Sequence, residues 1–175
     1  MTRQLTQAAQ VAKLCKQYLK SRGIACRVRS ENYSMGNSVN VYVTDQPPEV
    51  IAELKSEFAK YKYGYFDGMT DCYEYSNSRD DIPQTKFLFI ENGYSAERKQ
   101  AAYKYLRATI SGYEAFPAEY SEARSDRRKD SDYDVGTEVY QLLNGSGLCS
   151  PEFYDSLKAV PARLIPGTAL NTLSM

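Results

Sequence analysis

The chain has 175 residues, 22 basic and 22 acidic side chains, 42% hydrophobic residues, and neither histidine nor tryptophan. This composition is typical of one globular domain, or of one domain with an appendage, and it excludes a disordered chain. No apolar run approaches the roughly 20 residues that cross a bilayer, and the first residues lack the apolar block of a signal peptide. We therefore expect a cytoplasmic protein without a membrane partner.

The lack of histidine removes the commonest metal ligand, the commonest general base and the usual partner of a serine or cysteine nucleophile. No nucleophile motif is present either, so we expect a protein that is not an enzyme and has no catalytic residues, cofactor or metal. The four cysteines are scattered and form no Cys-x-x-Cys pair, which predicts free thiols at Cys15, Cys26, Cys72 and Cys149.

Charge is unevenly distributed along the chain. Residues 1–30 hold seven basic side chains and no acid, whereas residues 31–85 hold ten acids and four bases. This asymmetry indicates either a bipolar surface or two neighbouring elements of complementary charge.

Three elements are predicted at the start of the chain. Residues 5–22 have an apolar stripe at helical spacing, and Gly23 suits a left-handed helix end. Residues 24–29 and 38–44 alternate between apolar and polar side chains, so we expect two half-buried strands joined as a hairpin.

Residues 47–62 have a proline-led start and helical spacing, which predicts a second helix. Residues 63–83 are rich in Gly, Asp, Ser and Tyr and hold at most a short strand near residues 72–75. Residues 85–91 are apolar on both faces, which predicts a central strand covered on both sides. A third helix follows over residues 96–110.

The character of the chain changes after Gly112. Residues 114–134 are highly charged and predict either an exposed helix or a linker. Short helices are expected near residues 136–143 and 151–159, followed by a loosely attached tail.

The order α-β-β-α-(β)-β-α predicts an α+β fold, with a small antiparallel sheet and helices mainly on one face. We expect two parts, an α+β domain over residues 1–112 and a charged, helical C-terminal extension over residues 113–175. The extension either covers the sheet or forms a separate arm.

Three stretches carry a family resemblance. They are residues 9–14 with residues 27–30, residues 33–45, and residues 66–71 followed by Tyr73. In this order they resemble the twenty-ninth of the large polyvalent protein associated domains, over about residues 8–108. The resemblance implies a protein of a phage or conjugative plasmid that helps a mobile genetic element in its host cell. Counter-defence is one such role, for example as an anti-CRISPR or anti-restriction protein.

The most unusual stretch is residues 61–75, which interleaves tyrosines with acids. Tyrosine offers a large contact area with few rotors and is enriched at interfaces. The candidate partner-binding residues are Tyr63, Tyr65, Asp67, Asp71, Tyr73, Glu74 and Tyr75. In the competing interpretation, these tyrosines close the edge of the core beside a loop. The acids also suit a hard cation, but they lack the spacing of a calcium loop.

A second candidate site is a basic, aromatic face for single-stranded nucleic acid. Its residues are Lys13, Lys16, Lys20, Arg27, Arg29 and Tyr42. The competing interpretation is a face that is solvated or covered by the C-terminal part. From the residues and the resemblance together, we expect a non-enzymatic binding protein acting on a host protein or protein complex, with nucleic-acid binding as the alternative. The sequence makes no prediction of oligomeric state.

Overall fold

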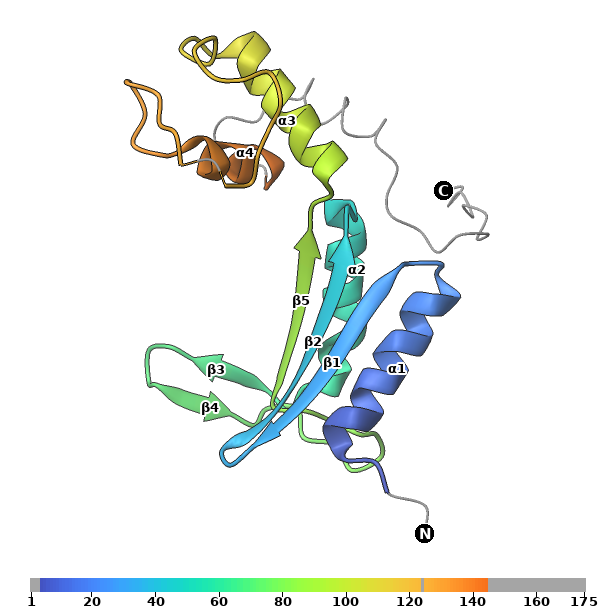
Figure 1. Cartoon of the computed structure of the whole chain (residues 1–175). Helices are drawn as coiled ribbons and strands as arrows, with labels where there is room; N and C mark the ends of the chain where they lie inside the picture. Colours follow the sequence, from blue (N-terminus) through green and yellow to red (C-terminus); the bar gives the residue numbers. More distant parts are fainter. Residues whose placement is uncertain (1–3, 124, 145–175) are drawn as a thin grey trace. The chain divides into compact units, whose positions relative to one another are not determined.

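The computed structural model describes residues 4–123 and 125–144 (Figure 1). In these residues the elements are, in order, α1 (Gln7–Ser21), β1 (Cys26–Tyr33), β2 (Gly36–Thr44), α2 (Pro48–Phe58), the 3-10 helix η1 (Ala59–Tyr61), β3 (Tyr65–Asp67), β4 (Cys72–Glu74), β5 (Phe87–Gly93), α3 (Ala96–Thr109) and α4 (Val135–Leu143). The predicted α+β class is confirmed. The helix expected at residues 151–159 and the tail lie outside the described residues.

Internal contacts divide the chain into two compact units, one with the described residues up to Gly93 and one starting at Tyr94. Helix α3, which the sequence places with the first domain, therefore belongs to the second unit. The predicted domain boundary at residue 112 is a statement about which part of the chain folds independently, and it stays a prediction.

The three-stranded sheet of unit 1 has the order β1-β2-β5. Strands β1 and β2 form an antiparallel hairpin, but β5 runs parallel to β2, with Ser38 opposite Phe87. The sheet is therefore mixed, and the prediction of an antiparallel sheet was wrong for β5. The physical reason is that α2 lies between β2 and β5 in the chain, and a helical crossover returns a strand in the parallel direction.

Both helices of unit 1 pack on one face of the sheet, as predicted. The alternating side chains of β2 at Val39, Val41 and Val43 are buried in one core cluster with residues of α1 and α2. The cluster is completed by Ala8, Val11, Cys15, Leu19, Ile24, Leu54, Phe58 and Leu88. Figure 1 shows α1 and α2 on the same side of the three strands.

Helix α1 begins and ends with the local chemistry that the sequence indicates. The Thr6 hydroxyl accepts a hydrogen bond from the Ala9 amide, and Gly23 takes a φ of +68° after the last turn. Cys15 lies on the buried stripe, and burial raises the pKa of its thiol to about 12. Cys15, Cys26 and Cys72 are free thiols, as predicted, and Cys149 lies outside the described residues.

Strand β5 differs from its prediction as a central strand covered on both sides. It is an edge strand of the sheet, with Leu88 and Ile90 toward the helices and Phe87 and Phe89 toward the other face. Phe89 is 50% exposed. In the described part of the chain, the apolar face of β5 that points away from the helices, which we call the open face, is thus partly in contact with solvent.

The buried amide of Gln84 organises the connection between η1 and β5. This side chain is 1% exposed, and its Nε2 donates to the carbonyls of Lys60 and Asn77 at 2.9 and 2.8 Å. Its Oε1 accepts from the Arg79 amide at 2.7 Å. Gln84 therefore ties together both ends of the segment from which the β3–β4 hairpin emerges.

Helices α3 and α4 pack together in unit 2. Their shared core is Ala102, Tyr103, Leu106, Tyr113, Val135, Val139, Leu142 and Leu143. The prediction of α4 is confirmed. The segment before it was expected to be an exposed helix or a linker, but its described residues follow an irregular, non-helical path. The Tyr103 hydroxyl donates to the Pro117 carbonyl at 2.7 Å, and the buried Tyr113 ring packs edge-on against Tyr103.

A buried carboxylate holds this irregular segment against α4. Glu138 is 2% exposed, and it accepts hydrogen bonds from Arg128 at 2.8 Å, from Ser131 at 2.5 Å and from the Tyr113 hydroxyl. Burial alone would raise the pKa of Glu138, but these donors and the charge of Arg128 outweigh burial and lower it. Residues that read as a solvated linker therefore contribute to the core.

We expect Gly64→Ala to destabilise unit 1, because a Cβ at this position would lie 1.7 Å from the Glu74 carbonyl oxygen. Overpacking of this kind costs about 1–3 kcal/mol. The matched control is Gly68→Ala in the same hairpin, where a Cβ meets nothing within 4 Å. Chemical denaturation of the two variants measures the difference. Equal stability of the two would contradict the close approach of the chain at Gly64.

We expect Glu138→Gln to lower the free energy of unfolding by about 1.5–3 kcal/mol at pH 7, since charged hydrogen bonds are lost from a buried site. The folded pKa of Glu138 lies below its unfolded value near 4.5. Its stabilisation is therefore full above that value and is lost as the pH falls through the folded pKa. The gap between wild type and variant, measured by thermal unfolding, should shrink as the pH is lowered below about 4.5. A gap independent of pH would exclude an ionised Glu138.

Candidate partner-binding surface

The short hairpin of β3 and β4 presents large apolar side chains to solvent. Tyr65 lies opposite Glu74 in its register, and Asp67 lies opposite Cys72. Tyr65 and Phe66 are 55% and 53% exposed, and Met69 in the turn is 94% exposed. In Figure 1 the hairpin extends away from the three-stranded sheet. Its apolar side chains are thus available for contact with another molecule.

A continuous row of five rings links this hairpin to β5. Its members, in order of contact, are Tyr63, Tyr75, Tyr73, Phe87 and Phe89, and we call them the aromatic row. Successive ring centroids are 6.3, 4.9, 5.5 and 6.1 Å apart. Tyr75 is 60% exposed, and Phe87 and Phe89 lie nearly parallel, with an angle of 7° between their planes.

Tyr73 anchors the centre of the row. Its hydroxyl donates to the Lys86 carbonyl at 2.5 Å, and the Lys86 ammonium lies 5.3 Å from its ring centroid. Burial raises the pKa of this half-buried tyrosine. Tyr73 therefore has a structural role as well as an exposed edge, and its ring contacts both Tyr75 and Phe87.

The structure places the tyrosines of the candidate site on the surface rather than in the core. Tyr65 and Tyr75 are exposed, Tyr63 and Tyr73 are half-buried, and the main core cluster of unit 1 contains none of these four. The interpretation of this stretch as a closing edge of the core therefore fits only the inner sides of Tyr63 and Tyr73.

The three acids of the candidate site differ in their surroundings. Asp67 shapes the hairpin turn, because its carboxylate accepts from the Met69 amide at 2.9 Å and the Thr70 hydroxyl at 3.1 Å. Asp71, with a φ of +54°, and Glu74 are exposed. Within residues 4–123 and 125–144, no three acidic or cysteine side chains gather in a way that would hold a metal ion.

The face of the sheet opposite the helices carries part of the second candidate site. The register places Arg27 and Arg29 of β1 on this open face. Arg27 lies opposite Tyr42 of β2, and Arg29 lies in line with Asn40 of β2 and Phe89 of β5. The Arg27 guanidinium carbon lies 5.8 Å from the centroid of Tyr42. Arginine and aromatic side chains thus share one face of the sheet.

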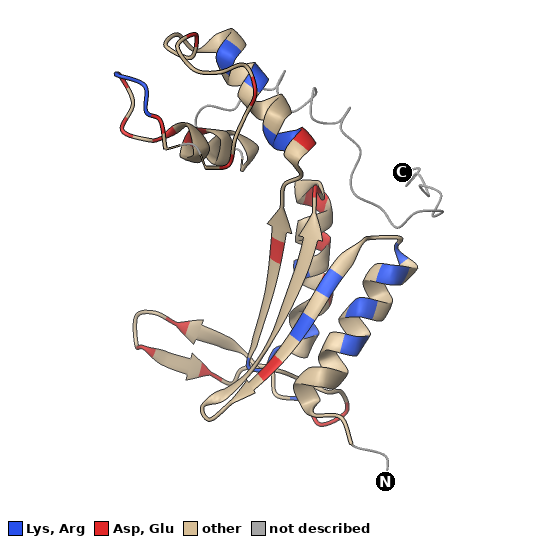
Figure 2. Ribbon diagram, in the orientation of Figure 1, with Lys and Arg blue, Asp and Glu red and all other residues tan. Residues whose placement is uncertain are grey.

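The lysines of the second candidate site are on a different element. Lys13, Lys16 and Lys20 are exposed on α1, which packs against the helix-covered face of the sheet (Figure 2). The residues proposed for one basic face are therefore divided between the outside of α1 and the open face.

Four residues of the observed surface were missed in the sequence. Phe66 and Met69 were not named, and Phe87 and Phe89 were assigned to a covered strand. The signal that would have located the two phenylalanines is the helix between β2 and β5, which makes β5 a parallel neighbour of β2. Period-two alternation then places Phe87 and Phe89 on the same face as Tyr42.

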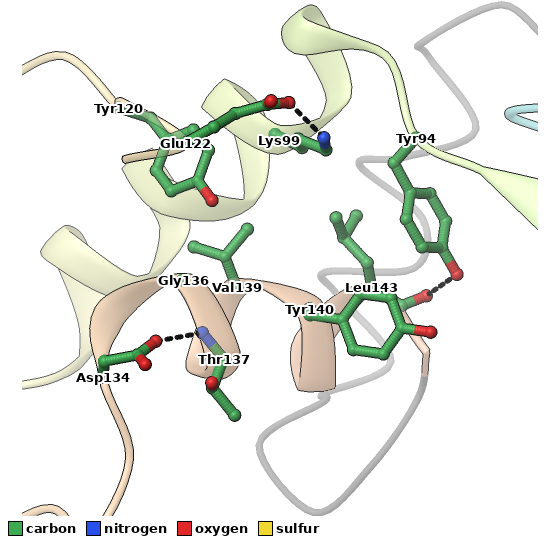
Figure 3. A pocket seen from close by; sticks show the side chains of 10 residues that line it. All are labelled: Tyr94, Lys99, Tyr120, Glu122, Asp134, Gly136, Thr137, Val139, Tyr140 and Leu143. Atoms are coloured by element: carbon green, nitrogen blue, oxygen red, sulfur yellow. Dashed lines mark hydrogen bonds and ion pairs between the residues drawn. The ribbon is translucent and has the colours of Figure 1, made fainter. Parts of the chain in front are cut away.

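Unit 2 has a pocket of its own, of about 430 Å³, between α3, α4 and the segment around Tyr120 (Figure 3). Several of its polar side chains are engaged with neighbouring groups. Lys99 pairs with Glu122, Asp134 accepts from the Thr137 amide at the start of α4, and the Tyr94 hydroxyl bonds to the Leu143 carbonyl. These interactions stabilise the unit, and we assign the pocket no ligand.

Comparison with protein families identifies the family to which this α+β protein belongs. The model of the family described as Large polyvalent protein associated domain 29 matches residues 6–111. The chain is a member of this family, as its resemblance predicted, and the membership implies a protein associated with a phage or another mobile element. The match includes the hairpin and the aromatic row, whereas α4 lies beyond it.

Neither the search of curated proteins nor the search of solved structures found a match. Among residues 4–123 and 125–144, none of the helices combines the length and the apolar character needed to cross a lipid bilayer.

Proposed function

We propose that the protein is a non-enzymatic binding protein of a phage or mobile element that acts on a host protein or protein complex. The observation that supports this proposal is the aromatic row with its exposed hairpin. Tyr65, Phe66, Met69 and Tyr75 are exposed in the hairpin segment, and Phe89 is exposed on the open face of the three-stranded sheet. Apolar groups gathered in this way are characteristic of interaction sites, and tyrosine in particular is enriched there.

The charge of the hairpin favours a partner with a basic surface. Asp71 and Glu74 are exposed beside the rings, and complementary charge speeds association and selects partners. Proteins that handle nucleic acid carry such basic surfaces, because they neutralise phosphates with lysine and arginine. A CRISPR or restriction complex of the host would offer a surface of this kind, so we propose counter-defence as the form that the binding takes.

Binding of single-stranded nucleic acid is the second candidate function. It is favoured by the open sheet face, where Arg27 lies over Tyr42 and the parallel rings of Phe87 and Phe89 offer stacking surfaces. We rank it second because Glu31 and Glu91 share that face and would repel phosphates.

We expect Tyr65→Ala and Tyr75→Ala to weaken capture of the host partner by about 2 kcal/mol or more each, as for aromatic side chains central to an interface. The matched control is Tyr133→Ala in unit 2, which removes a tyrosine of similar exposure, 53%, and should leave capture unchanged. The measurement is affinity capture from nuclease-treated host lysate, followed by titration of the captured protein. Circular dichroism confirms that each variant is folded. Equal capture by all three variants would refute the proposed surface.

Charge reversals separate the two candidate functions. For a basic protein partner, Asp71→Lys should slow association and reduce its dependence on salt, whereas Arg27→Glu and Arg29→Glu should have little effect. For nucleic acid, the arginine reversals should weaken binding of a single-stranded oligonucleotide and flatten its salt dependence, because fewer counterions are released. Association rates at two salt concentrations distinguish these patterns.

A further inference from the structure

The outer edge of β5 presents backbone groups of a kind that a further strand can pair with. The Gly93 carbonyl accepts from the Asp45 amide at 2.9 Å, so the backbone of Gly93 is directed toward the β2 side. Backbone direction alternates along a strand, so Phe87, Phe89 and Glu91 also face β2. The amides and carbonyls of Leu88 and Ile90 are then directed away from the sheet.

The chain itself pairs with the backbone at Thr85, which precedes β5 and is separated from it by a bend at Lys86. Thr85 donates its amide to the Tyr61 carbonyl at 2.8 Å and accepts at its own carbonyl from the Tyr63 amide at 3.1 Å, so the chain at Lys62 runs parallel to it. The neighbouring chain turns away at the buried Gly64. Within the described residues, no backbone partner continues along the outer side of Leu88 and Ile90.

A groove of about 460 Å³ lies along this edge, between β5 and α2. Its lining is Lys55, Phe58, Ala59, Lys62, Leu88, Phe89, Ile90 and Glu91. Phe58 and Leu88 belong to the core, so the floor is apolar, and Phe89 forms part of the rim toward the open face. The groove therefore combines backbone hydrogen-bonding groups with apolar contacts.

The charges at the groove select among extended chains. Lys55 and Lys62 line it, and the structure gives neither ammonium an ion pair within residues 4–123 and 125–144. Glu91 is the single acid of the lining. The excess of positive charge favours a segment with carboxylates, and it disfavours a second copy of this chain, whose β5 edge carries the same excess.

We propose that this groove binds an extended, acidic peptide segment of a protein partner by strand addition to β5. Main-chain hydrogen bonds to Leu88 and Ile90 would supply affinity, and alternate side chains of the peptide would enter the apolar groove. Carboxylates of the peptide would meet Lys55 and Lys62. The segment is thus a strand with apolar residues at every second position and acids beside them.

This inference does not depend on the proposed function of the hairpin. Tyr65 and Tyr75 do not line the groove, so a partner can use either surface alone. Tyr65→Ala should therefore leave binding to the groove unchanged. Failure of the hairpin proposal and failure of the strand-addition proposal are distinguishable in this way.

The test uses the full-length protein and a phage-displayed library of random dodecapeptides. We expect enrichment of sequences with alternating apolar residues and at least one acid. The selected peptide is then synthesised in two N-methylated forms, one methylated at every even-numbered amide and one at every odd-numbered amide. Methylation of the amides that pair with β5 should weaken binding about tenfold or more, whereas methylation of the other amides should have little effect. No enrichment of such sequences, or equal binding of the two methylated forms, would overturn the proposal.

Variants of the protein locate the site. Ile90→Pro removes an outward amide while leaving the β2 pairing in place, and it should weaken the peptide about tenfold or more, with Ile90→Val as the matched control. Lys55→Glu and Lys62→Glu should each weaken the peptide several-fold, and Lys13→Glu on α1 should not. Should Ile90→Pro fail to fold, the two methylated forms of the peptide and the lysine variants still decide. Peptide binding that is insensitive to Lys55 and Lys62, or a β5-dependent dimer by sedimentation, would contradict the assignment.

Discussion

The arrangement of unit 1 depends on one constraint, which is that α1 and α2 both pack against the same face of a three-stranded sheet. The valines of β2 fill this interface, and the side chains between them necessarily point the other way. Two helices bury one face well, and they leave the opposite face to Arg27, Tyr42, Phe87 and Phe89. The exposed rings are thus a consequence of one-sided packing, and they lie at a place where the core does not need them.

Unit 2 is built by a different balance. Two short helices offer little apolar surface, and a buried carboxylate is costly unless its hydrogen-bonding capacity is filled. Glu138 meets this condition through Arg128, Ser131 and Tyr113, which come from a segment without regular structure. The segment is ordered by side-chain contacts, and this explains how so polar a stretch can belong to a folded unit.

Much of the fold follows from sequence periodicity, and the exceptions have physical causes. The helical stripe of α1 and the alternation of β2 are local properties, so their elements and buried faces could be predicted. The parallel direction of β5 could have been inferred from the helix between β2 and β5, but its position at the edge of the sheet depends on how the chain packs, which local patterns do not report. The tyrosines of residues 61–75 could be named, but not the ring contacts that join Tyr73 to Phe87. The path of residues 113–134 depends on hydrogen bonds to Glu138. The polar composition of this segment does not indicate that Glu138 is their acceptor.

The Gln84 anchor gives the β3–β4 hairpin a particular evolutionary freedom. The amide fixes both ends of the segment that carries the hairpin, while the residues beyond Gly64 and before Ser76 take no part in the main core cluster. We therefore expect substitutions, and even changes of length, at the tip to leave the folding of the sheet intact. A mobile element that passes between hosts meets partners whose surfaces diverge. Under the proposed function, a binding hairpin on a constant base could change its specificity in a few steps, while selection for stability acts on separate residues.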